Sequence, residues 1–460
     1  MKKKKQKSNN ILNIINNSNN FKWKSFCLII LFIIVCLLNI ETIKHPYIMM
    51  EDGFVFINGF IKDGLISFTF TYGGYLCIAS RIIAGISVLF GSIFNSLIVE
   101  VQINKLISIF VVCFILNLFN DDRFSFISSH RLIRFAFSIV ALLLSSNFLS
   151  VMYTNLSMNW WSGIYLILCI MLLLNNDKLK IYEIVLLVVA ILSTPFSFII
   201  LIPLFFKIID TILKKNKINK FDIIFYSIIT IFIIIQIYSI ITSKNVDSAS
   251  SVSLGISGLF NVIKYALYMS FLSLNYLFTP IYYHFGSTHL LFGLISGFII
   301  FAIMLIISIR KKMFKYFISL CGITFLIYSL TLIKYSANLQ PYFLELIDKQ
   351  YLIWYHLVPA MNVLFCLYLI IGNNILYNKI TIGIYCSLFI IVSIILGMNS
   401  YKTDLDYVHY IYDINQYINY KSGEYTCVKT PPKWVDWCVW VPVNDDYCRG
   451  ENNECVKEIQ

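Results

Sequence analysis

Two adjacent carboxylates, Glu51 and Asp52, follow the first apolar stretch of the chain and stand directly before Gly53. A positioned carboxylate can remove a proton from a hydroxyl group, and general-base catalysis of this kind typically contributes about 10²–10⁴-fold to a rate. Carboxylates in a polar loop are also well solvated, so the simplest alternative is a loop without a chemical role. The residues that accompany the pair favour a catalytic role over a solvated loop. We take Asp52 as the candidate general base, with Glu51 as its alternate.

Cations, aromatic rings and amides accompany the carboxylate pair. They are Tyr72, Tyr75, Arg81, Asn155, Asn159, Trp160, Lys349, Tyr351 and His356, all expected at one membrane face. Lys and Arg side chains bind phosphate, and flat aromatic rings pack against sugars. A carboxylate, a cation and aromatic rings at one face therefore predict a site for a sugar that is linked to a lipid phosphate.

Several of these side chains also have a purely structural interpretation. Arg81, on an apolar helix, can extend its charged end to the lipid headgroups, and Trp160 can anchor the chain at a membrane interface. His356 can be a hydrogen-bonded core residue. Asn155 also begins an Asn-Leu-Ser sequence, which is a glycan acceptor only in a eukaryotic secretory pathway.

The sequence lacks the motifs of several other classes of catalytic or cofactor-binding site. It contains no phosphate-binding Gly-rich loop, dinucleotide fingerprint, nucleophile elbow or His-Glu-x-x-His pair. We therefore predict no cofactor, although a divalent metal stays open. The apolar runs carry few charges and no inverted repeat is visible, which argues against an ion-coupled transporter.

The elements that must position these side chains are membrane helices. Of 460 residues, 58% are hydrophobic and 13% are charged, against about 25% charged in ordinary soluble domains. Apolar runs of about 18–20 residues recur, each long enough to cross a ~30 Å hydrocarbon core. The sequence predicts an all-α, polytopic transmembrane helix bundle in the cell (inner) membrane. The net charge of +12 comes largely from short clusters that flank apolar runs, so no nucleic-acid partner is expected.

These basic clusters set the expected topology, because cytoplasmic loops carry the positive excess. They predict about 11 spans, with the N-terminus inside and the C-terminus outside. The clearest spans are residues 26–40, 135–152, 160–174, 222–242, 290–309, 316–334, 352–371 and 380–398. Residues 26–40 form an uncleaved first span, since no small-residue cleavage site follows. Residues 181–213 are too long for one straight span, and Pro195 predicts a helical hairpin with both ends cytoplasmic.

Two regions allow more than one topology. Residues 75–98 and 97–119 could both cross the membrane. We expect only the second to cross, because every basic cluster is then cytoplasmic. Residues 75–95 then form a juxtamembrane or re-entrant helix, and the same argument makes residues 256–279 interfacial.

The chain divides into three regions. Residues 1–25 form a basic, disordered cytoplasmic tail, and residues 26–398 form the transmembrane domain, with its first outer loop at 41–75. Residues 399–460 form an exported tail with four cysteines, which are Cys427, Cys438, Cys448 and Cys455. Four clustered cysteines predict two disulfides in one of three pairings and an oxidising compartment. A zinc site is the alternative, but the tail has no Cys-x-x-Cys pair.

Residues 51–81 carry a resemblance to a known type of enzyme. Glu51-Asp52-Gly53, followed by FINGFIKDGLISFTFTYGGYLCIASRIIA, resembles the first outer loop of uncharacterised bacterial multi-span proteins of the GT-C glycosyltransferase type. TNLSMNWW (154–161), LSTPFSFIILIPLFF (192–206) and PPKWVDW (431–437) fit the same pattern in the same order.

The resemblance implies an integral-membrane glycosyltransferase. Such an enzyme moves a sugar from a polyprenyl-phosphate donor, here to a cell-surface glycan or glycolipid on the outer face, with inversion at the anomeric carbon. It implies that Asp52, or Glu51 as alternate, is the essential acidic residue of the first outer loop. Arg81 and Lys349 are then the expected contacts of the donor phosphate.

The chain departs from this enzyme type at two places. The later Arg-Tyr motif falls on Gln350-Tyr351, so the cation nearest to it is Lys349. The next outer loop offers Asn155 and Asn159 where a second acidic residue often stands, which implies metal-independent transfer.

Two other classes of function stay open from the sequence. One is a flippase or transporter of a lipid-linked glycan, which needs polar groups along a path through the bundle. The other is a scaffold whose tail binds partners. The polar candidates gather at the outer ends of the helices, and this distribution favours the enzyme.

Overall fold

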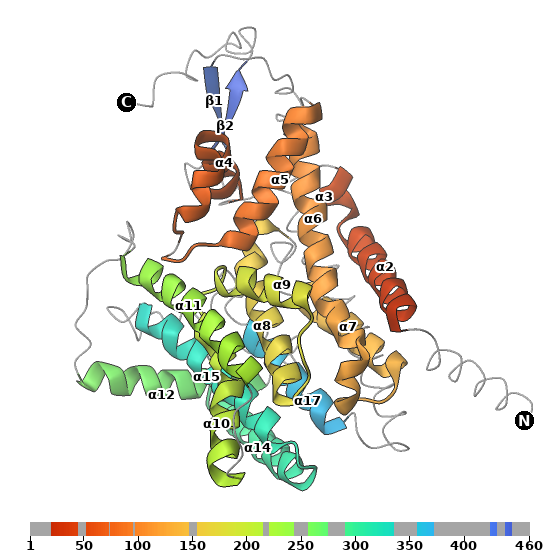
Figure 1. Cartoon of the computed structure of the whole chain (residues 1–460), viewed down its shortest axis with the longest axis vertical. Coiled ribbons are helices and arrows are strands. Elements are labelled where there is room, and N and C mark those ends of the chain that lie inside the picture. The colour runs from red at the N-terminus through yellow and green to blue at the C-terminus, as the bar shows by residue number, and fades with distance from the viewer. Residues whose placement is uncertain are drawn as a thin grey trace, which may run out of the picture.

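The computed structural model describes residues 20–44, 52–72, 74–94, 97–146, 154–214, 220–242, 256–274, 290–334, 357–371, 424–429 and 438–443. The longer helices among them are α2 Asn20–Leu38, α5 Ile78–Phe94, α6 Leu97–Asn117, α7 Arg131–Ser146, α8 Met158–Leu174, α9 Ile181–Ile191, α10 Ile202–Lys214, α11 Lys220–Thr242, α12 Ile256–Ser273, α14 Leu290–Arg310, α15 Phe314–Lys334 and α17 Leu357–Ile371 (Figure 1). Short helical elements are α3 Ile40–Lys44, η1 Asp52–Ile57, α4 Asn58–Asp63, η2 Gly64–Thr69, η3 Leu118–Asn120, η4 Asp122–Phe126, η6 Asn155–Ser157 and η7 Ser197–Leu201. One antiparallel ribbon, β1 Glu424–Lys429 with β2 Cys438–Val443, is the exception to this helical fold.

Five helical stretches of the described chain are long and apolar enough to cross a membrane. They are Asn20–Leu38, Val99–Asn120, Asp222–Ile240, Leu291–Arg310 and Phe314–Ile333. The helices α5, α8 and α9 are apolar but shorter. This composition indicates a multi-pass membrane protein, as the sequence predicts. The number of spans and their sidedness stay predictions.

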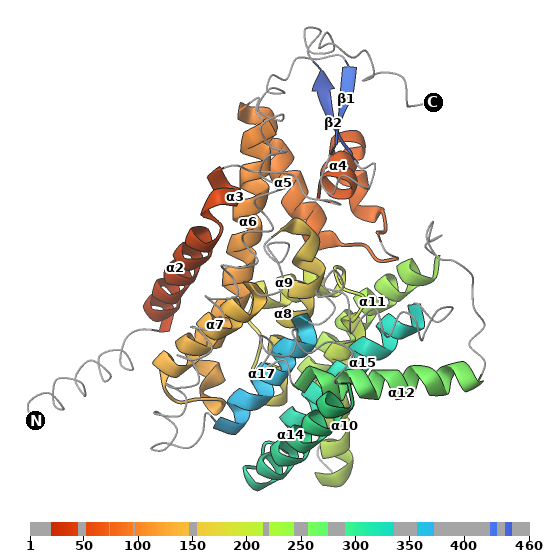
Figure 2. The same ribbon diagram turned by 180° about the vertical axis from the view of Figure 1, so that it is seen from behind.

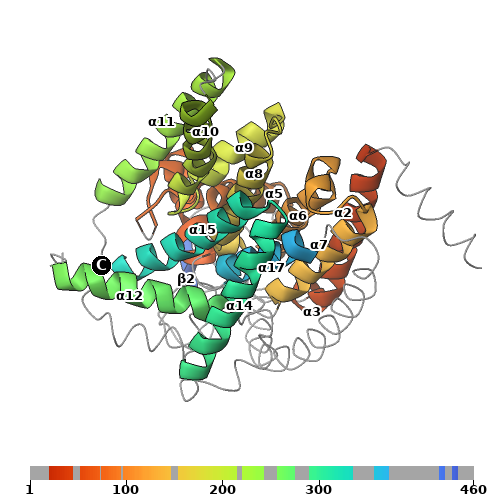
Figure 3. The ribbon, with the colours of Figure 1, turned by 90° about the horizontal axis from the view of Figure 1, so that it is seen from below.

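The central helix of the bundle is α8. Every residue of α8 except Asn159 is buried, and α5, α6, α9, α15 and α17 all contact it. The view along the long axis shows α8 among these neighbours (Figure 3). A helix that is apolar on all sides must be buried on all sides, and the sequence MNWWSGIYLILCIMLLL meets that requirement. By contrast, α12 lies across the long axis of the molecule (Figures 1 and 2).

Helix boundaries differ from the sequence prediction at two basic clusters. Helix α2 begins at Asn20, inside the segment expected to be a disordered tail, because Trp23 is buried against Phe135. Helix α7 begins at Arg131 rather than at residue 135, since Asp122 neutralises the charges in its first turn. Residues 352–356 and the span expected at 380–398 lie outside the described residues.

The helix break predicted within residues 181–213 is confirmed. Helix α9 ends at Ile191 and α10 begins at Ile202, with Pro195 in the irregular segment between them. Inside a membrane, backbone groups freed by such a break need partners from the protein. Gln236, fully buried in α11, supplies one by donating from Nε2 to the carbonyl oxygen of Thr194 at 3.3 Å.

The same break supports the beginning of α5. The backbone N–H of Ile78 donates to the carbonyl oxygen of Leu192 at 3.4 Å. The backbone N–H of Ala79 donates to Oγ of Ser193 at 2.7 Å. The first N–H groups of a helix have no partner within the helix, so the break in one helix caps another.

A buried carboxylate, Asp121, joins three elements at one end of the bundle. Its Oδ2 lies 3.0 Å from Nζ of Lys24 and 3.5 Å from Nζ of Lys180, and its Oδ1 lies 3.0 Å from Nε of Arg123. Arg123 also binds Glu183 of α9. Burial by itself raises the pKa of Asp121, but the hydrogen bond from Arg123 and the charge of Lys24 outweigh it and hold the pKa well below its usual range.

Other basic residues of the described chain lie at this same end. Asp122 binds Arg131 and Arg134 in the first turn of α7. Lys315, at the start of α15, donates to the carbonyl oxygen of Leu174 at the end of α8. We call this end of the bundle the basic end. Clusters from distant parts of the chain meet there, as a common side of the membrane would require, while its assignment to the cytoplasm stays a prediction.

Two groups of cysteines bear on the predictions, and Cys386 lies outside the described residues. The seven that the described helices and connecting segments carry, including Cys27 and Cys113, are free thiols in buried or half-buried positions. In the ribbon, Cys427 is paired in register with Trp440, and Cys438 with Lys429. Cys448 and Cys455 lie outside the described residues, so the two predicted disulfides stay a prediction.

Candidate functional site

Six of the predicted site residues are described with their side chains, and they lie in one region. These are Tyr72, Tyr75, Arg81, Asn155, Asn159 and Trp160. Asp52 is described by its backbone, as the first residue of η1, whereas Glu51, Lys349, Tyr351 and His356 lie outside the described residues. The region lies where α5 and α8 begin, at the opposite end of α8 from the basic end.

Hydrogen bonds join the beginnings of these two helices. Asn159 donates from Nδ2 to the hydroxyl of Tyr75 at 2.7 Å. Asn155 donates from Nδ2 to the carbonyl oxygen of Ser80 at 2.8 Å, and Ser80 donates from Oγ to the carbonyl oxygen of Asn155 at 2.9 Å. Both asparagines, placed by sequence in a different loop from the tyrosine, therefore meet the segment that contains Tyr75.

Trp160 has a different setting from the open aromatic surface that sugar packing needs. Its side chain is 8% exposed, and its ring lies 5.7 Å from that of Phe196, centroid to centroid. Its backbone N–H donates to Oδ1 of Asn159 at 2.8 Å. In this conformation Trp160 belongs to the core, and it contributes to the site by holding Asn159.

Arg81 is the buried cation of the site. It is 2% exposed, so it does not extend to lipid headgroups. Its Nε donates to the carbonyl oxygen of Leu76 at 3.2 Å and its Nη2 to that of Phe70 at 2.9 Å. The guanidinium carbon lies 5.6 Å from the ring centroid of Phe56, within cation–π range. Two carbonyls and a ring thus fix the orientation of the guanidinium.

One nitrogen of this guanidinium has no partner among the residues that the structure describes. Nη1 of Arg81 is buried and makes no hydrogen bond to any residue that the structure describes. None of the carboxylates with described side chains forms an ion pair with Arg81 either. A side chain added at Gly59 would place its Cβ 3.3 Å from Nη1. Because a buried charge without a counter-charge costs several kcal/mol, this position is one at which an anion would be stabilised.

The chain folds tightly before Arg81. Tyr72 and Tyr75 exchange backbone hydrogen bonds of 2.8 and 3.2 Å, and Gly74 between them has a φ of 95°. Cys77 has a φ of 56°, which is uncommon for a residue with a side chain. The turn and Cys77 end the loop, and α5 begins at Ile78. The Tyr-Gly-Gly-Tyr sequence is thus a turn that delivers Arg81 into the core.

The segment that carries Asp52 packs on the same helix. Element η1, a short π-helical turn, contacts α4 and α5, and its Phe56 and Ile57 are buried in a small cluster with Cys77 and Ala84. The ring of Phe56 lies between this segment and Arg81. The expected loop at 41–75 is therefore largely helical in its described part, and η1 is adjacent to the helix that carries Arg81.

The C-terminal ribbon also reaches this segment. Strand β2 contacts η1, although the two are almost 400 residues apart in the chain. Figures 1 and 2 show the ribbon beyond α4, at the end of the molecule opposite to the basic end. Sequence reasoning treated the tail as a separate region and did not place it at the site.

Sequence reasoning also missed Gln236 and Phe56. Gln236 accepts a hydrogen bond from the backbone N–H of Leu76 at 3.4 Å, so it supports the loop that Arg81 binds. Its signal was available, since an amide in the middle of an apolar helix is unusual. Phe56 had no such signal, because nothing in the sequence distinguishes it from the other aromatic residues as the ring that contacts Arg81.

The described residues contain no group of three His, Cys, Asp or Glu side chains that could hold a metal ion. Comparisons of the chain with protein-family models, with curated proteins and with solved structures found no match.

Proposed function

We propose that this protein is an integral-membrane glycosyltransferase that uses a polyprenyl-phosphate sugar as donor. The observation that carries the proposal is Arg81, a buried cation with one nitrogen that no described residue bonds. It lies on the helix against which the segment carrying Asp52 packs. A guanidinium binds phosphate, as it binds carboxylate, through charge-assisted hydrogen bonds. A carboxylate and a phosphate-binding cation on neighbouring elements are the two groups that such a transfer needs.

The proposed reaction is a single displacement. Asp52 takes the proton of an acceptor hydroxyl, and the oxygen attacks the anomeric carbon of the donor sugar. The bond between that carbon and the phosphate oxygen breaks, and its electron pair leaves with the polyprenyl phosphate. Arg81 stabilises the charge that develops on the leaving phosphate. One displacement inverts the anomeric centre.

The remaining parts of the proposal concern setting and partners. The acceptor is a cell-surface glycan or glycolipid, and the reaction takes place at the outer face of the inner membrane. Lys349 and Tyr351, which lie outside the described residues, complete the phosphate site in this proposal, and His356 contacts the substrate. The contact between β2 and η1 supports a role for the exported tail next to the acceptor.

A flippase of a lipid-linked glycan is the second candidate, and one observation favours it. Transporters commonly have broken helices near the middle of the membrane, and the chain breaks between Ile191 and Ile202. However, the break is held by protein groups, since Ser193 and Thr194 bond to α5 and α11. Fewer polar groups are then left to line a path, and the enzyme is the better supported of the two.

Asp52→Asn tests the proposal directly. The substitution keeps the size of the side chain but removes its basicity, so transfer from a radiolabelled polyprenyl-phosphate sugar should fall about 10²–10⁴-fold. Glu51→Gln should have a smaller effect, because adjacent residues face different directions. Asp63→Asn is the matched control, since Asp63 is an exposed carboxylate at the end of α4 in the same region.

The outcomes separate the candidates. Loss of transfer in Asp52→Asn with normal membrane insertion supports the enzyme. Loss in Glu51→Gln alone would move the role of base to Glu51. If neither variant changed transfer, the carboxylate pair would be a solvated loop. If the wild type moved the lipid across the bilayer without forming a new glycosidic bond, the flippase would replace the enzyme.

A further inference from the structure

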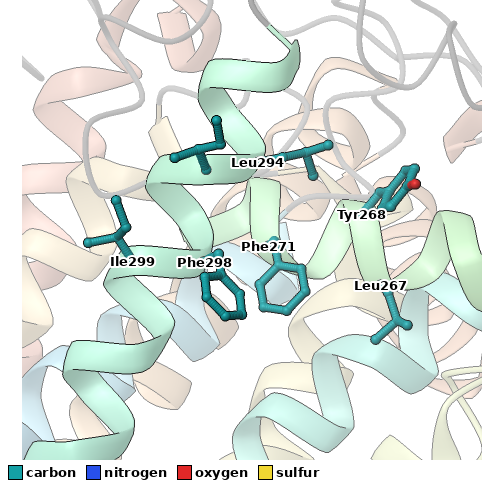
Figure 4. Close-up of a pocket in the computed structure, with 7 residues that line it drawn as sticks. Leu267, Tyr268, Phe271, Leu294, Phe298 and Ile299 are labelled. Atoms are coloured by element: carbon teal, nitrogen blue, oxygen red, sulfur yellow. The ribbon is translucent and has the colours of Figure 1, made fainter.

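An open apolar groove of about 360 Å³ lies between α12 and α14. Figure 4 shows Leu267, Tyr268 and Phe271 on the α12 side and Leu294, Phe298 and Ile299 on the α14 side. The rings of Phe271 and Phe298 pack edge to face, with 5.7 Å between their centroids, and so connect the two sides of the groove. The groove is separate from the site at Arg81, because the two have no lining residue or helix in common.

The lining of this groove has the chemistry of a hydrocarbon-binding surface. The hydroxyl of Tyr268 is its one polar side-chain group, and the other lining side chains are aliphatic or Phe. Phe298 is 58% exposed and Ile299 is 52% exposed. In a helix bundle that crosses a membrane, such side chains face lipid, and a groove between two helices holds one chain more closely than a flat surface does.

One cation stands at the edge of the groove. Lys264 lies one helical turn before Tyr268, with its Nζ 5.7 Å from the ring centroid of Tyr268 and 5.6 Å from that of Tyr265. Lys264 is exposed, α12 has no acidic residue, and none of the described carboxylates forms an ion pair with it. An ammonium group that stacks on Tyr rings and has no carboxylate partner among the described residues is suited to a phosphate headgroup. Each Lys near a membrane surface adds about 1 kcal/mol of attraction to anionic lipid.

We propose that this groove binds one anionic phospholipid of the surrounding bilayer. A fatty-acyl chain lies against Phe271 and Phe298, and the phosphate of the headgroup lies at Lys264. The apolar lining selects the chain, and the cation selects the headgroup. The proposal does not depend on glycosyl transfer, because no residue of the site at Arg81 takes part in it.

Photo-crosslinking with two matched lipid probes tests the proposal. Full-length protein is reconstituted with phosphatidylglycerol or phosphatidylcholine that carries a diazirine on one acyl chain, and labelled peptides are identified by mass spectrometry. Both peptides that contain α12 and α14 should be labelled, with a preference of about fivefold for phosphatidylglycerol, the factor that ~1 kcal/mol corresponds to. Lys264→Gln should abolish the preference.

Two further variants make the result specific. Lys220→Gln removes an exposed cation at the start of α11, outside the groove, and should leave the preference unchanged. Leu294→Trp fills the groove and should reduce labelling by both probes. Equal labelling by the two probes in the wild type, or a preference that survives Lys264→Gln, would refute the headgroup assignment.

A third probe separates the sources of lipid phosphate. If a diazirine-bearing polyprenyl phosphate labelled the groove and unlabelled phosphatidylglycerol did not compete, the occupant would be the carrier lipid and the assignment to a bilayer phospholipid would be wrong. Asp52→Asn should leave all labelling unchanged, because Asp52 lies in η1, outside the groove. A failure of the transferase proposal would therefore leave this result standing.

Discussion

Replacing Arg81 by Lys and by Met should reveal whether its charge lacks an internal partner. Lys keeps the charge but reaches only one of the two carbonyls that Arg81 binds, at 2.9 and 3.2 Å. Loss of one hydrogen bond to a charged group costs about 1.5–3 kcal/mol, so Arg81→Lys should lower the free energy of unfolding by about 2 kcal/mol.

Arg81→Met changes the free energy of unfolding through two opposing contributions. It leaves both carbonyls without a donor, at ~1–3 kcal/mol each, but it also removes a buried charge that costs several kcal/mol when unpaired. These terms nearly cancel, so ligand-free Arg81→Met should be no less stable than Arg81→Lys. A loss of about 3–5 kcal/mol in Arg81→Met is what breaking a buried ion pair costs, and it would refute the reasoning by indicating an internal counter-ion.

The assay is unfolding in lipid micelles with and without polyprenyl phosphate. At 100 times its Kd, a ligand that binds only the folded protein adds about 2.7 kcal/mol to the free energy of unfolding. Wild type should show this gain and Arg81→Met should not. Ser80→Ala is the control, since it removes a buried, neutral hydrogen bond of 2.9 Å beside Arg81. It should cost about 1 kcal/mol and keep the full gain from the lipid.

Three other predictions concern the rest of the fold. Asp121→Asn should cost about 3–5 kcal/mol of unfolding free energy, because it removes the charge of a buried carboxylate that pairs with the half-buried Lys24 and Arg123. Asp222→Asn, at a more exposed pair, should cost at most ~1 kcal/mol. Because the folded-state pKa of Asp121 is lowered, its stabilisation should be complete above the ordinary carboxyl pKa of about 3.9 and disappear as the pH falls below it in an acid titration. Gln236→Leu should cost ~1–2 kcal/mol in the same assay, since two backbone groups lose their partner. Peptide mapping without reductant should not find Cys427 linked to Cys438, because their diagonal register separates the Cα atoms by ~7–8 Å, beyond the usual disulfide range.

The sequence predicts most helices of this bundle, because membrane helices are specified by the apolar length of each run. The break near Pro195 follows equally from local chemistry. The predicted starts at residues 26 and 135 were wrong, because contacts with distant residues extend the two helices back to Asn20 and Arg131. In α2, Trp23 packs against Phe135 and the neighbouring Lys24 pairs with a distant carboxylate. In α7, Arg131 pairs with Asp122 of another element. The local pattern does not show these partners, and a basic residue alone predicts the end of an apolar run.

The candidate site is harder to predict from sequence than the helices are. The residue types of Arg81, Tyr75 and Asn159 indicate candidates for a site. In the structure Asn159 donates a hydrogen bond to Tyr75, and the helices that carry Arg81 and Asn159 are in contact. The sequence pattern does not predict that the side chain of Arg81 is buried. Arg81 could equally have faced the headgroups, and only the carbonyls of Phe70 and Leu76 explain why it turns into the core.

Helix α8 connects the candidate site with the basic end of the bundle. Its first residues meet the site through Asn159, and its last carbonyl, that of Leu174, accepts a hydrogen bond from Lys315 at the basic end. Seventeen residues at 1.5 Å each place these ends about 25 Å apart, close to the thickness of a hydrocarbon core. Since cytoplasmic ends carry the positive clusters, the end with Arg81 and η1 should face outward. Reporter fusions after Lys217 and Lys315 should therefore read cytoplasmic, and a fusion after Ser400 external. A cytoplasmic signal from Ser400 would place the tail, and with it β2, on the cytoplasmic side. The proposed site would then face the cytoplasm and not the outer face.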